Sequence, residues 1–200
     1  MLKFLNKIIF DPNDFRSVIA ACIAGNSQAQ HILFKKYFGY AKSICLRYTY
    51  SPEEAEEVLN EGFLKVFNNL ERYDPEQPFK AWLRTVMVNN AISYFRRNKK
   101  HYAARTAFDE IPEPGIADDA VSEITAGEIM QLIHELKPIY KTVFLMYAVD
   151  GYCHKEIATM LDINEATVRS QYARARAQLQ ELIALHYPDL AEQYAMFSFQ

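Results

Sequence analysis

The sequence predicts an all-α protein with two small helical domains joined by a flexible acidic linker. Apolar residues recur at helical spacing in each structured segment, for example at Phe15, Val18, Ile19 and Cys22. No segment alternates apolar and polar residues over a useful length, which argues against strands. Residues 101–126 contain few large apolar side chains and many acids, a composition that is typical of a linker.

The N-terminal domain is expected over residues 10–100, with four helices. Asp14 is the expected N-cap of the first helix and Ser27 that of the second. The third start is the best marked, because Ser51 can cap, Pro52 suits the first helical position and Glu54 can close a capping box. The predicted helices end at about Gly25, Tyr50, Leu70 and Lys100.

The C-terminal domain is expected over residues 127–185, followed by an aromatic tail at 186–200. Its first helix follows from one apolar stripe, and Pro138 opens the next helix. The inward residues of these two helices are Ile129, Leu132, Ile133, Leu136, Val143, Phe144 and Tyr147.

Composition excludes several classes of protein. No apolar run approaches the roughly 20 residues of a membrane span. The first residues lack a small-residue cleavage site, so we expect no signal peptide and a cytoplasmic protein. Cys22, Cys45 and Cys153 are odd in number and far apart, which favours reduced thiols over disulfides. Cys153 adjoins His154 without a second ligand pair at zinc spacing, so no metal or other cofactor is expected.

The net charge of −3 conceals two opposite charge blocks. Residues 84–107 contain six Lys or Arg and no acid, whereas residues 109–128 contain seven acids and no Lys or Arg. Because salt screens charges beyond about 8–10 Å, a local basic patch can hold phosphate despite the acidic total.

Residues 154–179 read as two short helices joined by a tight turn, the pattern of a helix-turn-helix. Ile157, Ala158 and Leu161 face inward in the first helix, and Asn164 is expected to cap the second near Thr167. The outer face of the second helix can lie in the DNA major groove. The alternative is a plain helical hairpin whose arginine face is merely solvated. The expected DNA contacts are Glu165, Thr167, Arg169, Ser170, Tyr172, Arg174 and Arg176.

A second basic segment, residues 79–105, interleaves aromatic side chains with cations and amides. Single-stranded nucleic acid uses this mixture, since cations bind phosphate, rings stack on bases and amides reach base edges. Trp82 and Phe95 have helical spacing and are assigned to the core instead. The expected contacts are Arg84, Asn89, Asn90, Tyr94, Arg96 and Arg97.

With both segments in this order, the chain resembles an extracytoplasmic-function (ECF) sigma factor, the compact two-domain class of the sigma-70 family. The segment EEAEEVLNEGFLKVFNNLERYDPEQPFKAWLRTVMVNNAISYFRR resembles sigma region 2. The segment LKPIYKTVFLMYAVDGYCHKEIATMLDINEATVRSQYARARAQL resembles region 4. Asp162 stands where the family often has glycine, and Gln171 and Tyr172 stand where a basic residue is common.

The resemblance implies a monomeric, non-enzymatic subunit that gives RNA polymerase its promoter choice. The acidic helix at 53–70 would dock on the polymerase clamp through Glu57, Asn60, Glu61 and Phe67. The segment 84–97 would bind the −10 element and capture a base of the nontemplate strand. Region 4 would read the −35 element as duplex and rest on the polymerase flap, and the acidic linker would run through the active-site cleft. An anti-sigma protein is a further implied partner.

Two other functions were weighed against this one. A conventional helix-turn-helix regulator would normally dimerise and would leave the N-terminal domain unexplained. An enzyme would need a nucleophile with its base, paired carboxylates, a phosphate-binding glycine loop or metal ligands, and the sequence contains none of these patterns.

Overall fold

The structure, a computed structural model, describes residues 10–105 and 125–188. These residues form helices and connecting turns, and they contain no strand, as the sequence predicts. The chain divides into two compact units, Met1–Phe95 and Arg96–Gln200. In the described ranges no helix combines the length and the apolar character needed to cross a membrane.

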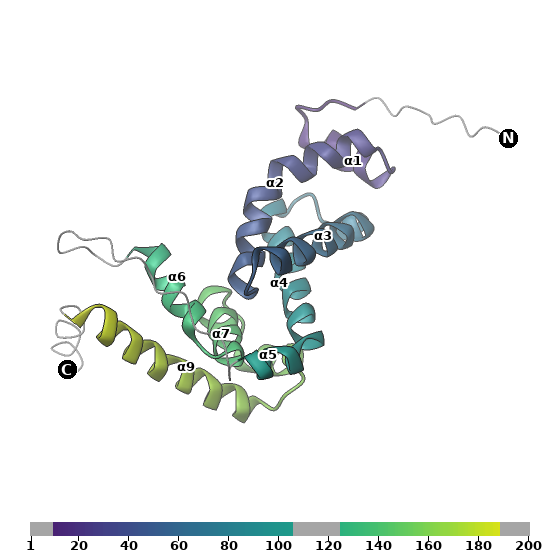
Figure 1. Ribbon diagram of the computed structural model, residues 1–200. Helices are drawn as coiled ribbons and strands as arrows, with labels where there is room; N and C mark the ends of the chain where they lie inside the picture. Colours follow the sequence, from purple (N-terminus) through teal and green to yellow (C-terminus); the bar gives the residue numbers. More distant parts are fainter. Residues whose placement is uncertain (1–9, 106–124, 189–200) are drawn as a thin grey trace. The chain divides into compact units, whose positions relative to one another are not determined.

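The first unit consists of four α-helices and one 3-10 turn (Figure 1). The second and fourth predicted helices end earlier than expected, and the charged end of the fourth forms a separate short helix, α5 (Lys99–Arg105). The elements are α1 (Phe15–Ile23), α2 (Ser27–Tyr48), α3 (Pro52–Asn69), η1 (Leu70–Arg72) and α4 (Phe79–Arg97).

Side-chain caps fix where these helices begin. The Asp14 carboxylate accepts hydrogen bonds from the backbone N–H groups of Arg16 and Ser17, as the sequence predicts. The prediction that Ser27 caps α2 is wrong, because the Asn26 side chain performs that role. At α3, the Glu54 N–H donates to Ser51 Oγ at 3.2 Å.

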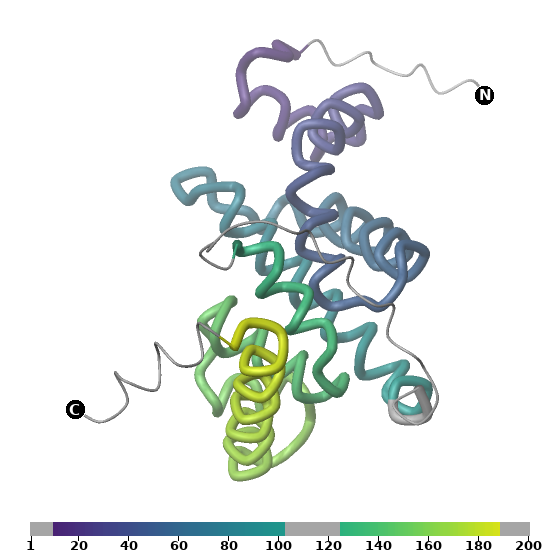
Figure 2. Tube along the Cα trace, turned by 60° about the vertical axis from the view of Figure 1, so that its left-hand side comes forward, coloured from purple at the N-terminus to yellow at the C-terminus, as the bar shows by residue number. Residues whose placement is uncertain are grey.

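Unit two contains the helix-turn-helix and the helices that support it (Figure 2). Apolar side chains from four helices meet in its core, with Leu132, Val143, Ile157 and Val168 all at most 4% exposed. After α5 the elements are α6 (Ala126–Glu135), α7 (Pro138–Phe144), the π-helical turn η2 (Leu145–Val149), α8 (His154–Leu161) and α9 (Glu165–His186).

Described helices occupy both ends of the predicted linker, residues 101–126. Helix α5 extends into it as far as Arg105, and Thr125 already caps α6 by accepting the Glu128 N–H. Residues 106–124 and 189–200 lie outside the described residues, so the predicted linker flexibility and most of the tail are untested.

Helices α3 and α4 approach closely at Gly62. A Cβ at this position would overlap Met87 Sδ and would lie 3.2 Å from Met87 Cε and 3.6 Å from Asn90 Nδ2. Met87 is fully buried, so its thioether would have to rearrange inside the core to admit an added methyl group. Glycine at position 62 therefore permits the contact between the two helices.

The two glycines inside long helices should respond oppositely to alanine. We expect Gly62→Ala to destabilise the protein by about 1–3 kcal/mol, because it overpacks a filled contact. Gly39→Ala should instead stabilise α2 by about 0.5–1 kcal/mol, since nothing lies within 4 Å of the added methyl group. Chemical denaturation of the two variants checks both signs, and equal effects would contradict the close approach at Gly62.

Candidate nucleic-acid interface

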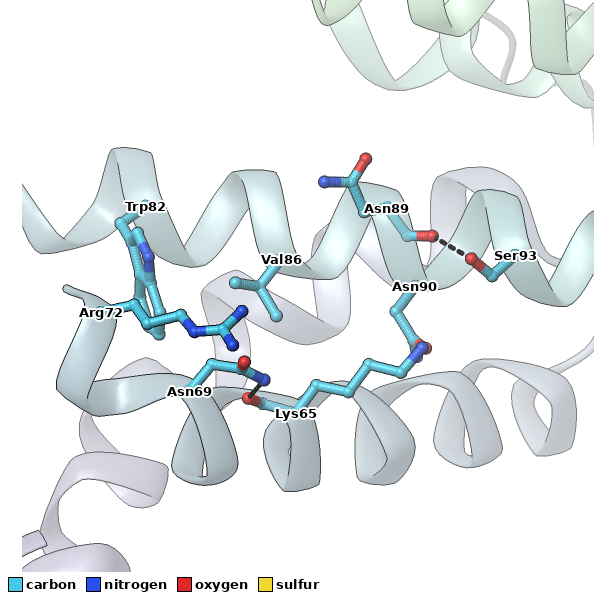
Figure 3. A pocket seen from close by; sticks show the side chains of 8 residues that line it. All are labelled: Lys65, Asn69, Arg72, Trp82, Val86, Asn89, Asn90 and Ser93. Atoms are coloured by element: carbon cyan, nitrogen blue, oxygen red, sulfur yellow. Dashed lines mark hydrogen bonds between the residues drawn. The ribbon is translucent and has the colours of Figure 1, made fainter. Parts of the chain in front are cut away.

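A groove runs between α3 and α4 on the surface of the first unit (Figure 3). Helix α4 supplies one wall and the end of α3, together with η1, supplies the other. The wall on α4 has one aromatic, one apolar and three uncharged polar side chains. The opposite wall contains two cations and an amide. The lining residues are Lys65, Asn69, Arg72, Trp82, Val86, Asn89, Asn90 and Ser93.

The spacing of Trp82, Val86, Asn89 and Ser93 places them on one face of α4. Their separations of four, three and four residues keep each within about 60° of the next around the helix. Asn89 is exposed, and the other three are half-buried. The stripe is therefore accessible along almost three turns of α4.

The Trp82 ring is held in position by its neighbours. Its centroid lies 5.5 Å from that of Tyr73 and 5.6 Å from that of Phe79. Tyr73 is fixed in turn, because its hydroxyl donates to the Gln77 carbonyl at 2.6 Å. These contacts hold the Trp82 ring in place at the groove. Little side-chain entropy is therefore lost when a ligand stacks on it.

Asn90 does not point outward as predicted. Its side chain is 1% exposed, Nδ2 donates to the Val58 carbonyl at 2.7 Å, and Oδ1 accepts from Lys65 Nζ. One residue of helix turns Asn90 about 100° away from Asn89 and toward α3. The Asn90 amide therefore joins the two helices at the floor of the groove, and its contact with DNA stays a prediction.

Two other predicted contacts, Tyr94 and Arg84, are not among the residues that line the groove. Tyr94 is 8% exposed, and its hydroxyl donates to Glu57 Oε2 at 3.0 Å, so its predicted base contact stays a prediction. Arg84 is half-buried and lies about 160° around α4 from Trp82. Arg96 and Arg97 are exposed at the end of α4, where the sequence predicted cations.

Most residues of the groove are not among the contacts that the sequence predicts. Helical spacing predicts a core position for Trp82, and no pattern in the sequence singles out Lys65, Asn69 and Arg72. Trp82 and Asn89 are seven residues apart and therefore share one face of the helix. This spacing could have predicted the α4 wall of the groove. The opposite wall depends on how α3 packs, which spacing within α4 does not reveal.

The predicted polymerase-facing residues share the outer side of α3. Glu57 and Asn60 are exposed, Glu61 is half-buried, and Phe67 packs with its ring centroid 6.1 Å from that of Phe63. Leu64, which was not predicted, lies among them and is 63% exposed. This face therefore combines acidic groups with one prominent apolar side chain.

The helix-turn-helix forms as predicted. Asn164 caps α9 by accepting the Thr167 N–H at 2.7 Å, and buried Ala158 occupies the inner face of α8. Asp162 ends α8 in the left-handed region at φ +54°, which substitutes for the glycine expected there. The Cys153 N–H donates to Glu156 at 2.7 Å, which lowers the pKa of that carboxyl and fixes the start of α8.

Most predicted contacts on α9 are accessible. Arg169, Ser170, Arg174 and Arg176 are exposed, and Glu165 and Thr167 are half-buried. Arg169 Nη2 pairs with Glu165 Oε1, one turn earlier, at 2.5 Å. The described residues contain no group of three or more His, Cys, Asp or Glu that could hold a metal ion.

Tyr172 does not project outward as predicted. It is half-buried, and its ring centroid lies 4.5 Å from that of Tyr147 and 6.0 Å from that of Phe144. The His154 ring stacks on Tyr147 with centroids 4.5 Å apart. An aromatic side chain at position 172 thus joins α9 to α8 and to the helix before it.

Comparison with known proteins agrees with this two-part architecture. Residues 33–101 match Sigma-70 region 2, and residues 126–179 match Sigma-70, region 4. The ECF RNA polymerase sigma-E factor of Haemophilus influenzae is 25% identical over 172 residues, covering 80% of this chain and 89% of that protein. The ECF sigma factor SigW of Bacillus subtilis is 27% identical over 149 residues, covering 69% and 80%.

Among solved structures, the sigma factor RpoE from Bartonella quintana, crystallised with the anti-sigma factor NepR, matches 76% of this chain and 95% of its own. Its TM-score is 0.48 at 16% identity.

Two separate sigma regions in the expected order define a transcription initiation factor rather than an enzyme. The chain belongs to the sigma-70 family, as an ECF RNA polymerase sigma factor.

The adjacent residues Asn89 and Asn90 provide a matched test of the groove. Asn90→Ala removes the donor to a buried carbonyl and should cost about 1–3 kcal/mol of stability. Asn89→Ala should leave the free energy of unfolding within about 0.5 kcal/mol of wild type, while weakening binding of polymerase holoenzyme to promoter DNA. Denaturation and DNA-binding titrations separate the two effects, and an Asn89 variant with normal binding would exclude that side chain as a contact.

Proposed function

We propose that this sigma factor binds core RNA polymerase, recognises promoters through two separate elements and opens the DNA at the nearer one. The observation that carries the proposal is the groove between α3 and α4, where a fixed tryptophan and an exposed amide face two cations. This combination suits a single strand rather than closed duplex, because stacking requires an unpaired base.

Strand capture at the groove would favour melting of the −10 element. Lys65 and Arg72 would attract phosphates, Trp82 would accept a base on its face, and Asn89 would bond to a base edge. Stacking contributes about 1–3 kcal/mol per base, which offsets the few kcal/mol that unstacking costs. The nontemplate strand is the proposed occupant.

The −35 element would be bound as intact duplex by α9. The N-terminal residues of this helix would meet base edges, and Arg174 and Arg176 would meet phosphates. The Glu165 carboxylate holds Arg169 before DNA arrives, so less side-chain freedom is lost on binding. Tyr172 would act from inside the domain by fixing the orientation of α9.

The outer face of α3 is the proposed site for the polymerase clamp. Its acids would speed and orient encounter with a basic partner. Leu64 would supply the apolar anchor that acidic groups alone lack, since a few desolvated side chains dominate interface energies. The flap is the proposed partner of the C-terminal unit. Because polymerase works there, the cytoplasm is the proposed location, and an anti-sigma protein is a further proposed partner.

The proposal predicts that the purified chain directs core polymerase to start transcription at genomic promoters. Run-off transcription on a genomic fragment library, followed by mapping of the transcript starts, measures this directly. Core polymerase alone is the control. Absence of any start that depends on this chain would contradict the proposed function.

Arg169→Ala should weaken holoenzyme binding to the −35 duplex by about 1–3 kcal/mol, or roughly 5- to 150-fold, because a base-edge contact is lost. Arg16→Ala is a matched control, since Arg16 is also an exposed arginine in an ion pair, with Glu76 at 2.9 Å. Gel-shift titration measures the affinity, and size-exclusion chromatography checks that the polymerase complex still forms. Loss of that complex with Arg169→Ala would contradict the assignment of this face of α9.

A further inference from the structure

A second cationic surface lies on the first unit, away from the groove. Lys36 of α2 and Lys80 of α4 are both exposed. Lys36 Nζ lies 5.1 Å from the centroid of the Phe15 ring, and Lys80 Nζ lies 5.0 Å from that of Tyr40. The ring centroids of Tyr37 and Phe79, the residues that adjoin the two lysines in sequence, are 4.8 Å apart. We call Lys36, Lys80 and the rings beneath them the lysine patch.

The charges of this patch are not neutralised within its unit. Neither lysine forms an ion pair among the described residues, in contrast to Arg16, Lys42 and Arg169. The rings orient the ammonium groups but provide no countercharge equal to a carboxylate. Two positive charges are therefore held in ordered positions and remain available to an external anion.

The patch lies on the opposite side of α4 from the groove. Lys80 and Trp82 are two residues apart, which places them about 160° from each other around the helix. A strand bound in the groove cannot reach the patch without crossing the helix, whose diameter with side chains is about 10–12 Å. The lysine patch would therefore bind a different part of an anionic ligand than the groove does.

We propose that the lysine patch binds the phosphate backbone of promoter DNA that flanks the strand held in the groove. This inference rests on the proposed function of the groove. A protein partner is less well suited, because lysine is depleted at protein interfaces and the aromatic rings here already lie under lysines. For the same reason the rings are not free to stack on bases, so the contact is independent of base sequence.

The test compares salt dependence of DNA binding by holoenzymes that contain wild-type chain or the double variant Lys36→Gln/Lys80→Gln. The probes are a forked DNA with a promoter mapped for this factor and a duplex of scrambled sequence. Each lost phosphate contact lowers the slope of log affinity against log salt by about 0.9. We expect the double variant to lose about 1.8 of slope on both probes. Its affinity deficit should be about 12-fold larger at 50 mM than at 200 mM salt.

Lys35→Gln is the matched control, because Lys35 is exposed on α2 but lies about 100° from Lys36 around the helix. It should keep the wild-type slope, and Lys36→Arg/Lys80→Arg should restore most of the lost slope. Thermal melting of the free chains checks that the variants fold.

Equal slopes of log affinity against log salt for wild type and Lys36→Gln/Lys80→Gln would overturn the proposed phosphate contact of the lysine patch. The proposal for the groove would not be affected. A double variant that binds DNA normally once assembled, but associates poorly with core polymerase, would also overturn the phosphate contact and would indicate a protein surface. If wild-type holoenzyme binds neither probe, the proposed function itself fails, and that outcome is distinct from the other two.

Discussion

The close contact between α3 and α4 is the constraint on which the first unit depends. Gly62 leaves room for Met87, and the Asn90 amide donates across the contact to the Val58 carbonyl. The same amide accepts from Lys65, a residue that lines the groove. The packing of two helices and the shape of the groove, the proposed nucleic-acid site, therefore share one buried hydrogen-bonded side chain. A change that loosens the contact would alter both stability and the groove.

The second unit uses an aromatic contact for a similar purpose. Tyr172 packs on Tyr147 instead of reaching outward. This contact attaches α9 to the π-helical turn η2. In the proposed function, the charged residues that remain on α9 would supply its affinity for DNA.

The helices, the two-domain division and the helix-turn-helix could be predicted because periodicity and caps are local properties of the sequence. The direction of single side chains could not be predicted in this way. Asn89 faces solvent, whereas Asn90, the next residue along the helix, lies in the contact between α3 and α4. Trp82 is half-buried rather than fully buried for a related reason. A residue at helical spacing with core residues can still lie at the edge of the core, where one face of its ring lines a groove.

The central claim is that the groove holds the nontemplate strand. Val86 lies within the groove, between Trp82 and Asn89 on α4, and can be replaced by the photo-crosslinking residue p-benzoylphenylalanine. The same replacement at Ala20, an exposed residue of α1, is the control. In open complexes, irradiation should crosslink position 86 to the nontemplate strand at the −10 element, and position 20 should give no such product. Crosslinks from position 86 only to a polymerase subunit would contradict the account.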